Sequence, residues 1–63
     1  MSFAENFKKA RKAAGLSQQQ VADALGLDRT AIAHYERGAS KPQFENISRI
    51  CELLSVPVNE LID

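Results

Sequence analysis

The sequence predicts an all-α domain, and three of its features support this. The chain is divided into segments of ordinary helix length by turn-forming residues, which are Gly15, Gly26, Gly38 and Pro57. Within the segments, apolar residues recur every three or four positions, which is the periodicity of a helix. No segment shows the alternating pattern of a half-buried strand. Val56-Pro57-Val58 leans toward β structure, but its proline argues against a strand.

The first two expected helices each begin with a capping box. Ser2 can cap the first helix, with Glu5 placed to bond back to it, and Ser17 with Gln20 repeats this arrangement. Gly15 and Gly26 then end the two helices, because glycine tolerates the left-handed backbone found there. In the first helix the apolar residues at helical spacing are Phe3, Phe7, Ala10 and Ala14. The second helix is expected to turn Val21, Ala24 and Leu25 toward the core.

Three more helices are expected after Gly26. Asp28 is an N-cap candidate for a helix over residues 29–37 that turns Ile32 and Tyr35 inward. A loop follows, and Pro57 can open a short last helix. The fourth helix is marked by core residues at helical spacing, which are Phe44, Ile47, Ile50, Cys51 and Leu54.

The connection between the second and third expected helices is very short. Only Gly26, Leu27 and Asp28 separate them, and so tight a connection forces a large angle between the two helices. Ala22 is expected where these helices come closest, since a larger side chain would push them apart. Residues 18–37 are therefore predicted to form a helix-turn-helix.

The composition limits the kinds of function open to this chain. Its 63 residues predict one domain, residues 1–63, which is too short for the water-excluding cleft of an enzyme. Cys51 and His34 stand at no familiar zinc spacing, so we expect no metal. With no second domain expected, we also expect no cofactor or small-molecule ligand. No apolar run reaches the ~20 residues of a membrane-spanning helix. Without a signal peptide, a cytoplasmic protein with no membrane partner is expected.

Charge is balanced overall but unevenly distributed. The chain has 8 basic and 8 acidic residues, whereas nucleic-acid-binding domains often have a pI above ~9. Basic residues gather before residue 13 and acidic residues after residue 42, so one face can still be basic. Lys8, Lys9 and Lys12 are expected to be solvated more than to contact phosphates.

The outer face of the third expected helix carries no carboxylate. With Ile32 and Tyr35 inward, this face consists of Arg29, Thr30, Ala33, His34 and Arg37. Such residues suit the major groove of DNA, where arginine can donate two hydrogen bonds to guanine and threonine can contact thymine. On this pattern alone, a solvated polar face of a small helical bundle remains an equal alternative.

Several short motifs recur in the same order in a known family. They are Gly15-Leu16-Ser17-Gln18, Val21-Ala22, Leu25-Gly26-Leu27, Ile32, Tyr35-Glu36-Arg37-Gly38 and Lys41-Pro42, followed by Leu53-Leu54-Ser55-Val56-Pro57 and Glu60-Leu61-Ile62. Together they make nearly the whole chain resemble the Cro/phage-repressor (Xre) family of helix-turn-helix regulators. The resemblance implies a compact five-helix, lambda-repressor-like domain whose helices 2 and 3 form the helix-turn-helix.

The resemblance also implies a role for individual residues. The implied base-reading residues are Arg29, Thr30, Ala33 and His34. The implied phosphate contacts are Gln18, Gln19, Arg37, Ser40 and Lys41. Arg11 and Glu36 are implied to form a structural salt bridge. Many family members carry a smaller polar residue in place of Arg29, which leaves open whether Arg29 reads guanine or contacts phosphate.

The implied partner is double-stranded operator DNA, bound by a homodimer on a palindromic site. The expected dimer surface is the apolar C-terminal part, made of Val56, Val58, Leu61 and Ile62, because the fifth helix is too short to bury all of it. The sequence does not give the operator. It also does not distinguish a repressor from an activator, or a phage repressor from a restriction-modification controller. The alternative function is a protein-interaction module of the antitoxin or anti-regulator kind, which would use helices four and five.

Overall fold

A computed structural model describes residues 2–62 of the chain. Its helices are α1 (Phe3–Ala13), α2 (Gln18–Leu25), α3 (Arg29–Arg37), α4 (Phe44–Leu54) and α5 (Val58–Leu61). Met1 and Asp63, the two ends of the predicted domain, lie outside the described residues. Because the described part contains helices and no strand, the all-α prediction is confirmed.

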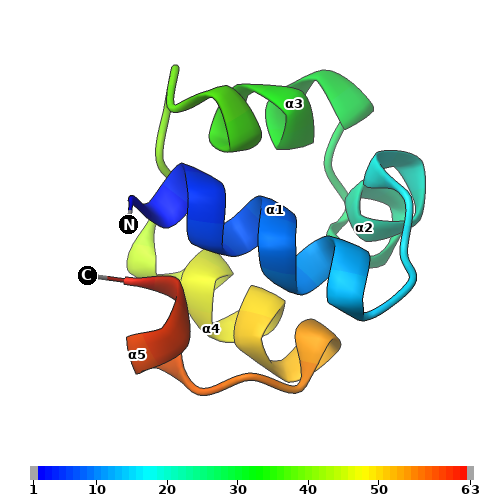
Figure 1. Cartoon of the computed structure of the whole chain (residues 1–63). Coiled ribbons are helices and arrows are strands. Elements are labelled where there is room, and N and C mark those ends of the chain that lie inside the picture. Colours follow the sequence, from blue (N-terminus) through cyan, green and yellow to red (C-terminus); the bar gives the residue numbers. More distant parts are fainter. Residues whose placement is uncertain (1, 63) are drawn as a thin grey trace.

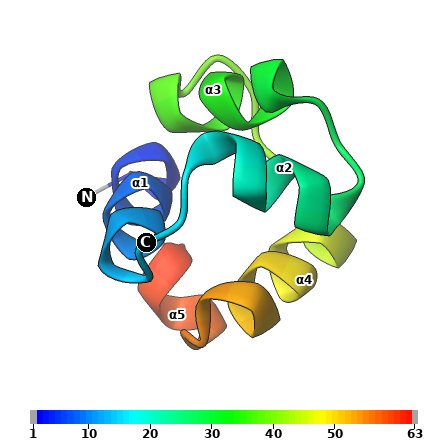
Figure 2. The same ribbon diagram turned by 90° about the vertical axis from the view of Figure 1, so that its right-hand side faces the viewer.

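The helices surround one hydrophobic core. α1 lies between α3 on one side and α4 with α5 on the other (Figure 1). α1 packs against α3 and α5, and α2 packs against both α3 and α4. The view in Figure 2 shows α4 and α5 closing the assembly opposite α3. The buried core residues are Phe3, Phe7, Val21, Ala22, Leu25, Ile32, Tyr35, Ile50, Cys51, Leu54 and Leu61.

Both predicted capping boxes are confirmed. The backbone N–H of Glu5 donates to Ser2 Oγ over 3.3 Å, and the backbone N–H of Ser2 donates to Glu5 Oε1 over 3.2 Å. In α2, the backbone N–H of Gln20 donates to Ser17 Oγ over 3.0 Å, and Ser17 N–H donates to Gln20 Oε1 over 2.8 Å. Each box satisfies backbone donors that a helix start otherwise leaves unpaired.

The tight connection between α2 and α3 also forms as predicted. Gly26 ends α2 with a φ of 70°, a left-handed conformation that favours glycine. The next N–H, of Leu27, donates to the carbonyl of Ala22 over 2.9 Å and closes the turn. Ala22 is fully buried at this contact. Asp28 occupies the N-cap position of α3, although its side chain makes no capping hydrogen bond.

Two of the predicted core positions are wrong. Ala24 is exposed, because the buried stripe of α2 runs through Val21, Ala22 and Leu25 and Ala24 falls outside it. Phe44 is 72% exposed. It is the first residue of α4, and the buried residues of that helix, Ile50, Cys51 and Leu54, all lie in its second half, so the core does not cover its start.

Candidate nucleic-acid interface

The outer face of α3 is free of other helices. α3 lies at one edge of the molecule, and in both Figure 1 and Figure 2 no helix of the described chain lies beyond it. Arg29, Thr30 and Arg37 are exposed, while Ala33 and His34 are half-buried. The structure therefore places the five predicted outer residues on one accessible surface. The half-buried pair, Ala33 and His34, lies closest to the body of the domain.

The inner face of α3 is fixed to the core. Ile32 is fully buried, and Tyr35 packs against Phe7 of α1 with ring centroids 6.2 Å apart. Gly38, with a φ of 77°, ends the helix and turns the chain into the loop that carries Ser40 and Lys41. A helix held from behind in this way presents its outer side chains without needing to reorganise on binding.

Charge on this face is positive. The described outer positions of α3 hold Arg29 and Arg37 and no carboxylate, because the acidic residue of the helix, Glu36, is turned toward α1. Asp28 is exposed just before Arg29 and reduces the positive charge at that end of the helix. This local distribution, and not the net charge of zero, is what an approaching polyanion meets.

The ion pair implied between Arg11 and Glu36 is present and nearly closed off from solvent. Arg11 Nη2 donates to Glu36 Oε1 over 3.1 Å, and Arg11 Nε donates to Glu36 Oε2. The side chains are only 10% and 4% exposed. Arg11 Nη1 also donates to the carbonyl of Leu16 over 2.8 Å. The guanidinium thus joins α1, the connection into α2, and α3.

Gln18 makes a contact that the sequence did not predict. Its Nε2 donates to Glu36 Oε1 over 3.1 Å. Glu36 accepts only, so it requires the nitrogen end of the carboxamide, which leaves the second N–H of that nitrogen free for another acceptor. The contact places the start of α2 beside the last turn of α3. Gln18 is therefore oriented before any ligand arrives.

These contacts also set the ionisation of Glu36. Burial raises the pKa of the carboxyl, but hydrogen bonds from Arg11 and Gln18, with the charges of Arg11 and Lys8, outweigh it. The net effect is a pKa below the ordinary value of 4.5. Glu36 is therefore ionised at neutral pH, and its charge is matched by the buried guanidinium.

The remaining residues implied to contact phosphate lie on exposed surface. Gln19 donates through Nε2 to Asp23 Oδ1 over 2.8 Å, so this side chain already has a partner within α2. Ser40 and Lys41 are exposed in the loop after α3. This loop follows directly on Arg37, so Arg37, Ser40 and Lys41 extend the α3 face along the chain.

The expected dimer residues do not form one surface. Leu61 is fully buried in the core, so the expectation that it is available to a partner is wrong. The reason is that even a helix of 4 residues turns one side inward, and Asn6 Nδ2 holds it there by donating to the Leu61 carbonyl over 3.2 Å. Val56 and Val58 are half-buried against the core. Ile62, directly after the end of α5, is 43% exposed.

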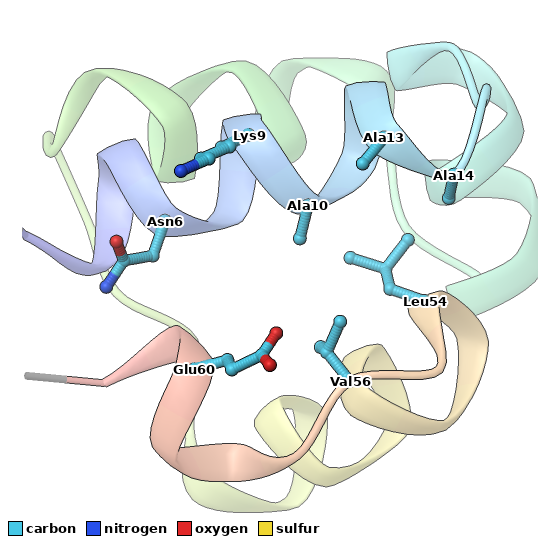
Figure 3. A pocket seen from close by; sticks show the side chains of 8 residues that line it. All are labelled: Asn6, Lys9, Ala10, Ala13, Ala14, Leu54, Val56 and Glu60. Atoms are coloured by element: carbon cyan, nitrogen blue, oxygen red, sulfur yellow. The ribbon is translucent and has the colours of Figure 1, made fainter.

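A groove of about 470 Å³ runs between α1 and the connection from α4 to α5 (Figure 3). Its apolar lining is formed by Ala10, Ala13, Ala14, Leu54 and Val56, with the polar residues Asn6, Lys9 and Glu60. In Figure 1 this region lies on the side of α1 away from α3. The groove is thus separate from the outer face of α3.

Residues 2–62 give little support to a membrane-spanning, metal-binding or thiol-based function. No helix there is long and apolar enough to cross a membrane. The same residues contain no cluster of three or more histidine, cysteine, aspartate or glutamate side chains that could hold a metal ion. Cys51 is a free, buried thiol whose pKa is raised by burial. Raising the pKa makes the thiolate rarer at neutral pH and Cys51 less reactive.

Comparison with known proteins identifies the family. The Helix-turn-helix family model matches residues 7–61, so the chain belongs to the helix-turn-helix family. Over 60 residues it is 40% identical to the uncharacterized HTH-type transcriptional regulator YqaE of Bacillus subtilis, covering 95% of this chain and 52% of YqaE. The chain therefore spans about half the length of that relative.

Two solved structures are similar over nearly the whole chain. The restriction-modification controller protein C.AhdI from Aeromonas hydrophila is 33% identical, with a TM-score of 0.86 over 95% of this chain and 91% of that chain. The P22 c2 repressor, crystallised with a synthetic operator, is 22% identical, with a TM-score of 0.92 over 100% of this chain and 96% of that chain. The second likeness confirms the phage-repressor type of fold.

Proposed function

We propose that this chain is the DNA-binding domain of a transcriptional regulator and that it reads double-stranded operator DNA in the major groove. The observation that carries the proposal is the outer face of α3, which is accessible, positively charged and fixed from behind by Ile32 and Tyr35. The family relationship and the regulator names of its relatives support the same function. Such a regulator would act in the cytoplasm.

Positioning and reading fall to different residues in this proposal. The residues that contact phosphates are Gln18, Gln19, Arg37, Ser40 and Lys41. The residues that face base edges are Arg29, Thr30, Ala33 and His34. Phosphate contacts fix the register of the protein on the duplex, while base contacts supply sequence preference. Ala33 is small, so it would let the helix lie close to the base edges.

Replacing Arg29 tests the proposal directly. Arg29→Ala is expected to weaken binding to a site selected from a random DNA pool by about 1–3 kcal/mol, roughly 5-fold to 150-fold. If Arg29 reads guanine, preference at one base pair also relaxes, and if it contacts phosphate, all sequences lose alike. Fluorescence anisotropy at fixed salt measures both outcomes.

Arg49 offers a matched control for this measurement. It is exposed on α4, where it donates to Asn46 Oδ1 over 3.4 Å, and it lies outside the proposed interface. Arg49→Ala should leave DNA affinity unchanged. A folded Arg29→Ala protein that binds the selected site as tightly as the wild type would contradict the proposal.

Lys41 is expected to contribute differently. Lys41→Ala should weaken binding to all sequences alike and flatten the plot of log affinity against log salt by about 0.9, the contribution of one phosphate contact. Lys9→Ala removes the same charge at the groove on the other side of α1 and should leave the slope unchanged. An unaltered slope for Lys41→Ala would remove Lys41 from the interface.

We also propose that two copies bind a palindromic operator. One α3 helix covers only a half-site, and two-fold symmetric dimers place recognition helices about 34 Å apart, one turn of DNA. A palindrome with that spacing, recovered from the random pool, would support a dimer. Recovery of single, unpaired half-sites would argue for a monomer.

A second candidate function is favoured by the groove of about 470 Å³ between α1 and the α4–α5 connection. An interaction module could seat a protein segment there. It predicts little effect of Arg29→Ala on its function and a large effect of substitutions at Val56, which lines the groove. The Arg29 experiment therefore separates the two functions.

A further inference from the structure

Phe44 is an apolar side chain that the fold leaves without a partner. It is 72% exposed, and the other exposed large hydrophobic residue of the described chain is Ile62, at 43%. A single exposed apolar residue is ordinary. A phenyl ring that is exposed to this extent is less common, and it raises the question of what covers it in the cell. Neither residue belongs to the proposed DNA-reading face.

A shallow apolar groove lies on the same side of the molecule. It has a volume of about 300 Å³ and is lined by Phe3, Lys41, Ile47 and Ile62. Ile47 follows Phe44 by three residues on α4, so the two side chains lie on neighbouring positions of that helix. The starts of α1 and α4 and the end of α5 all lie toward one side in Figure 1.

We propose that this side of the molecule is the contact between two copies of the chain, with Phe44 of each copy inserted into the groove of the other. The inference rests on the proposed function in one respect, namely that the two copies share one operator. It replaces the C-terminal surface expected from the sequence and keeps only Ile62 from it.

Symmetry is the first argument for a second copy as the occupant. A two-fold interface uses the same patch on both subunits, so the patch must contain both a protruding group and its receptor. Phe44 and the groove supply both on one side of this chain. The fit is reasonable in size, because an apolar cavity of about 150 Å³ accommodates benzene, and the groove is about 300 Å³.

Charge complementarity is the second argument. Glu45 directly follows Phe44 and is exposed, and Lys41 lines the groove. When Phe44 enters the partner's groove, Glu45 is carried toward the lysine of the opposite sign. The two-fold axis produces this pairing twice, so the contact is self-complementary in charge as well as in shape.

The position of the patch is the third argument. Lys41 belongs both to this groove and to the proposed phosphate contacts, and its loop runs from the end of α3 to the start of α4 (Figure 1). The patch therefore adjoins the DNA-facing edge. The proposal requires that a copy docked there keep its own α3 on the same side of the pair, so that both helices can reach the two half-sites of one duplex.

The size of the patch predicts a weak contact. Only a few side chains per copy take part, so the buried area falls below the roughly 1,200 Å² of a stable interface. The free protein should be mainly monomeric at micromolar concentration, and the pair should form when a palindrome supplies two adjacent half-sites. Dimer formation then appears as cooperative binding to DNA.

Phe44→Ala is the central test. On the palindrome selected with the wild-type chain, the variant should bind about tenfold more weakly or worse and lose cooperativity, because each pair loses two buried rings. On an isolated half-site it should bind like the wild type. Val58→Ala, on the surface expected from the sequence, should leave cooperativity unchanged.

A second measurement needs no DNA. In NMR spectra of the free wild-type chain recorded up to millimolar concentration, the signals of Ile47 and Ile62 should shift with concentration while those of Val56 and Val58 do not. Glu45→Lys should suppress these shifts, and Lys41→Glu combined with Glu45→Lys should restore them.

The outcomes separate the inference from the proposed function. If the chain binds no DNA but shows these shifts, the proposed function fails and the contact stands. If half-sites are bound and Phe44→Ala retains wild-type cooperativity, the contact is wrong and the proposed function stands. Shifts confined to Val56 and Val58 would also overturn the contact, in favour of the C-terminal surface.

Discussion

Glu36→Ala is expected to lower the free energy of unfolding by about 3–5 kcal/mol, the usual loss when one partner of a buried ion pair is removed. The variant leaves the Arg11 guanidinium in a site where its side chain is only 10% exposed, with the Leu16 carbonyl as its remaining hydrogen-bond partner. Gln18 loses its acceptor as well. Domains are stable by roughly 0.05–0.15 kcal/mol per residue, which is about 3–9 kcal/mol for 63 residues, so a loss of this size would remove between about a third and all of the stability of the chain. Urea denaturation at pH 7, followed by circular dichroism, measures it.

Two further variants isolate the cause. Glu36→Gln keeps the shape and one acceptor oxygen, so it should cost less than Glu36→Ala. Arg11→Met combined with Glu36→Met removes both charges, and replacing a whole buried pair by apolar groups is often close to neutral. The double variant should therefore be more stable than Glu36→Ala, even though the Leu16 carbonyl loses its donor. A double variant as unstable as the sum of the two single losses would show that the charges do not act as a pair.

The same variants can be followed as a function of pH. The pKa of Glu36 is lower in the folded chain than its ordinary value of 4.5, so the unfolded chain binds more protons in that range. The stabilisation is complete above about pH 4.5 and is lost as the pH falls through the folded pKa. The wild type should lose stability on acidification, and Glu36→Gln should lack this part of the loss.

Features that depend on neighbours in the sequence could be predicted. The capping boxes at Ser2 and Ser17 involve residues three apart, and the left-handed Gly26 reflects a local backbone requirement. The outward direction of Arg29 and Thr30 follows from helix periodicity once Ile32 is assigned to the core. These predictions need no knowledge of how the helices pack.

Features that depend on tertiary packing could not be predicted in the same way. Periodicity placed Phe44 on the core face of α4, but Phe44 is exposed. Leu61 was expected at a dimer surface, but Leu61 is buried. Whether another element covers an apolar side chain depends on where the helices end and how they pack. The bond from Gln18 to Glu36 joins residues from different helices and has no local signal. The Arg11–Glu36 pair is equally non-local, and only the resemblance to a family indicated it before the structure did.

Phe7→Ala is the other substitution with a large expected effect. Phe7 is fully buried, with its ring centroid 5.6 Å from that of Phe3 and 6.2 Å from that of Tyr35. Truncating a buried phenylalanine costs about 3–5 kcal/mol, because the cavity that remains is only partly refilled. Tyr35 is on the inner side of α3, so the loss also removes support from the helix proposed to read DNA.

The matched control is another phenylalanine at the opposite extreme of exposure. Phe44→Ala removes the same side chain from a position that is 72% exposed, and it should change the free energy of unfolding by no more than about 0.5 kcal/mol. Both variants are compared by urea denaturation at low micromolar concentration, where the proposed pair is dissociated. Equal losses would mean that Phe44 is packed in the core after all. A stable Phe44→Ala monomer that has lost cooperative DNA binding would instead assign Phe7 to folding and Phe44 to association, although the sequence pattern gives the two residues the same role.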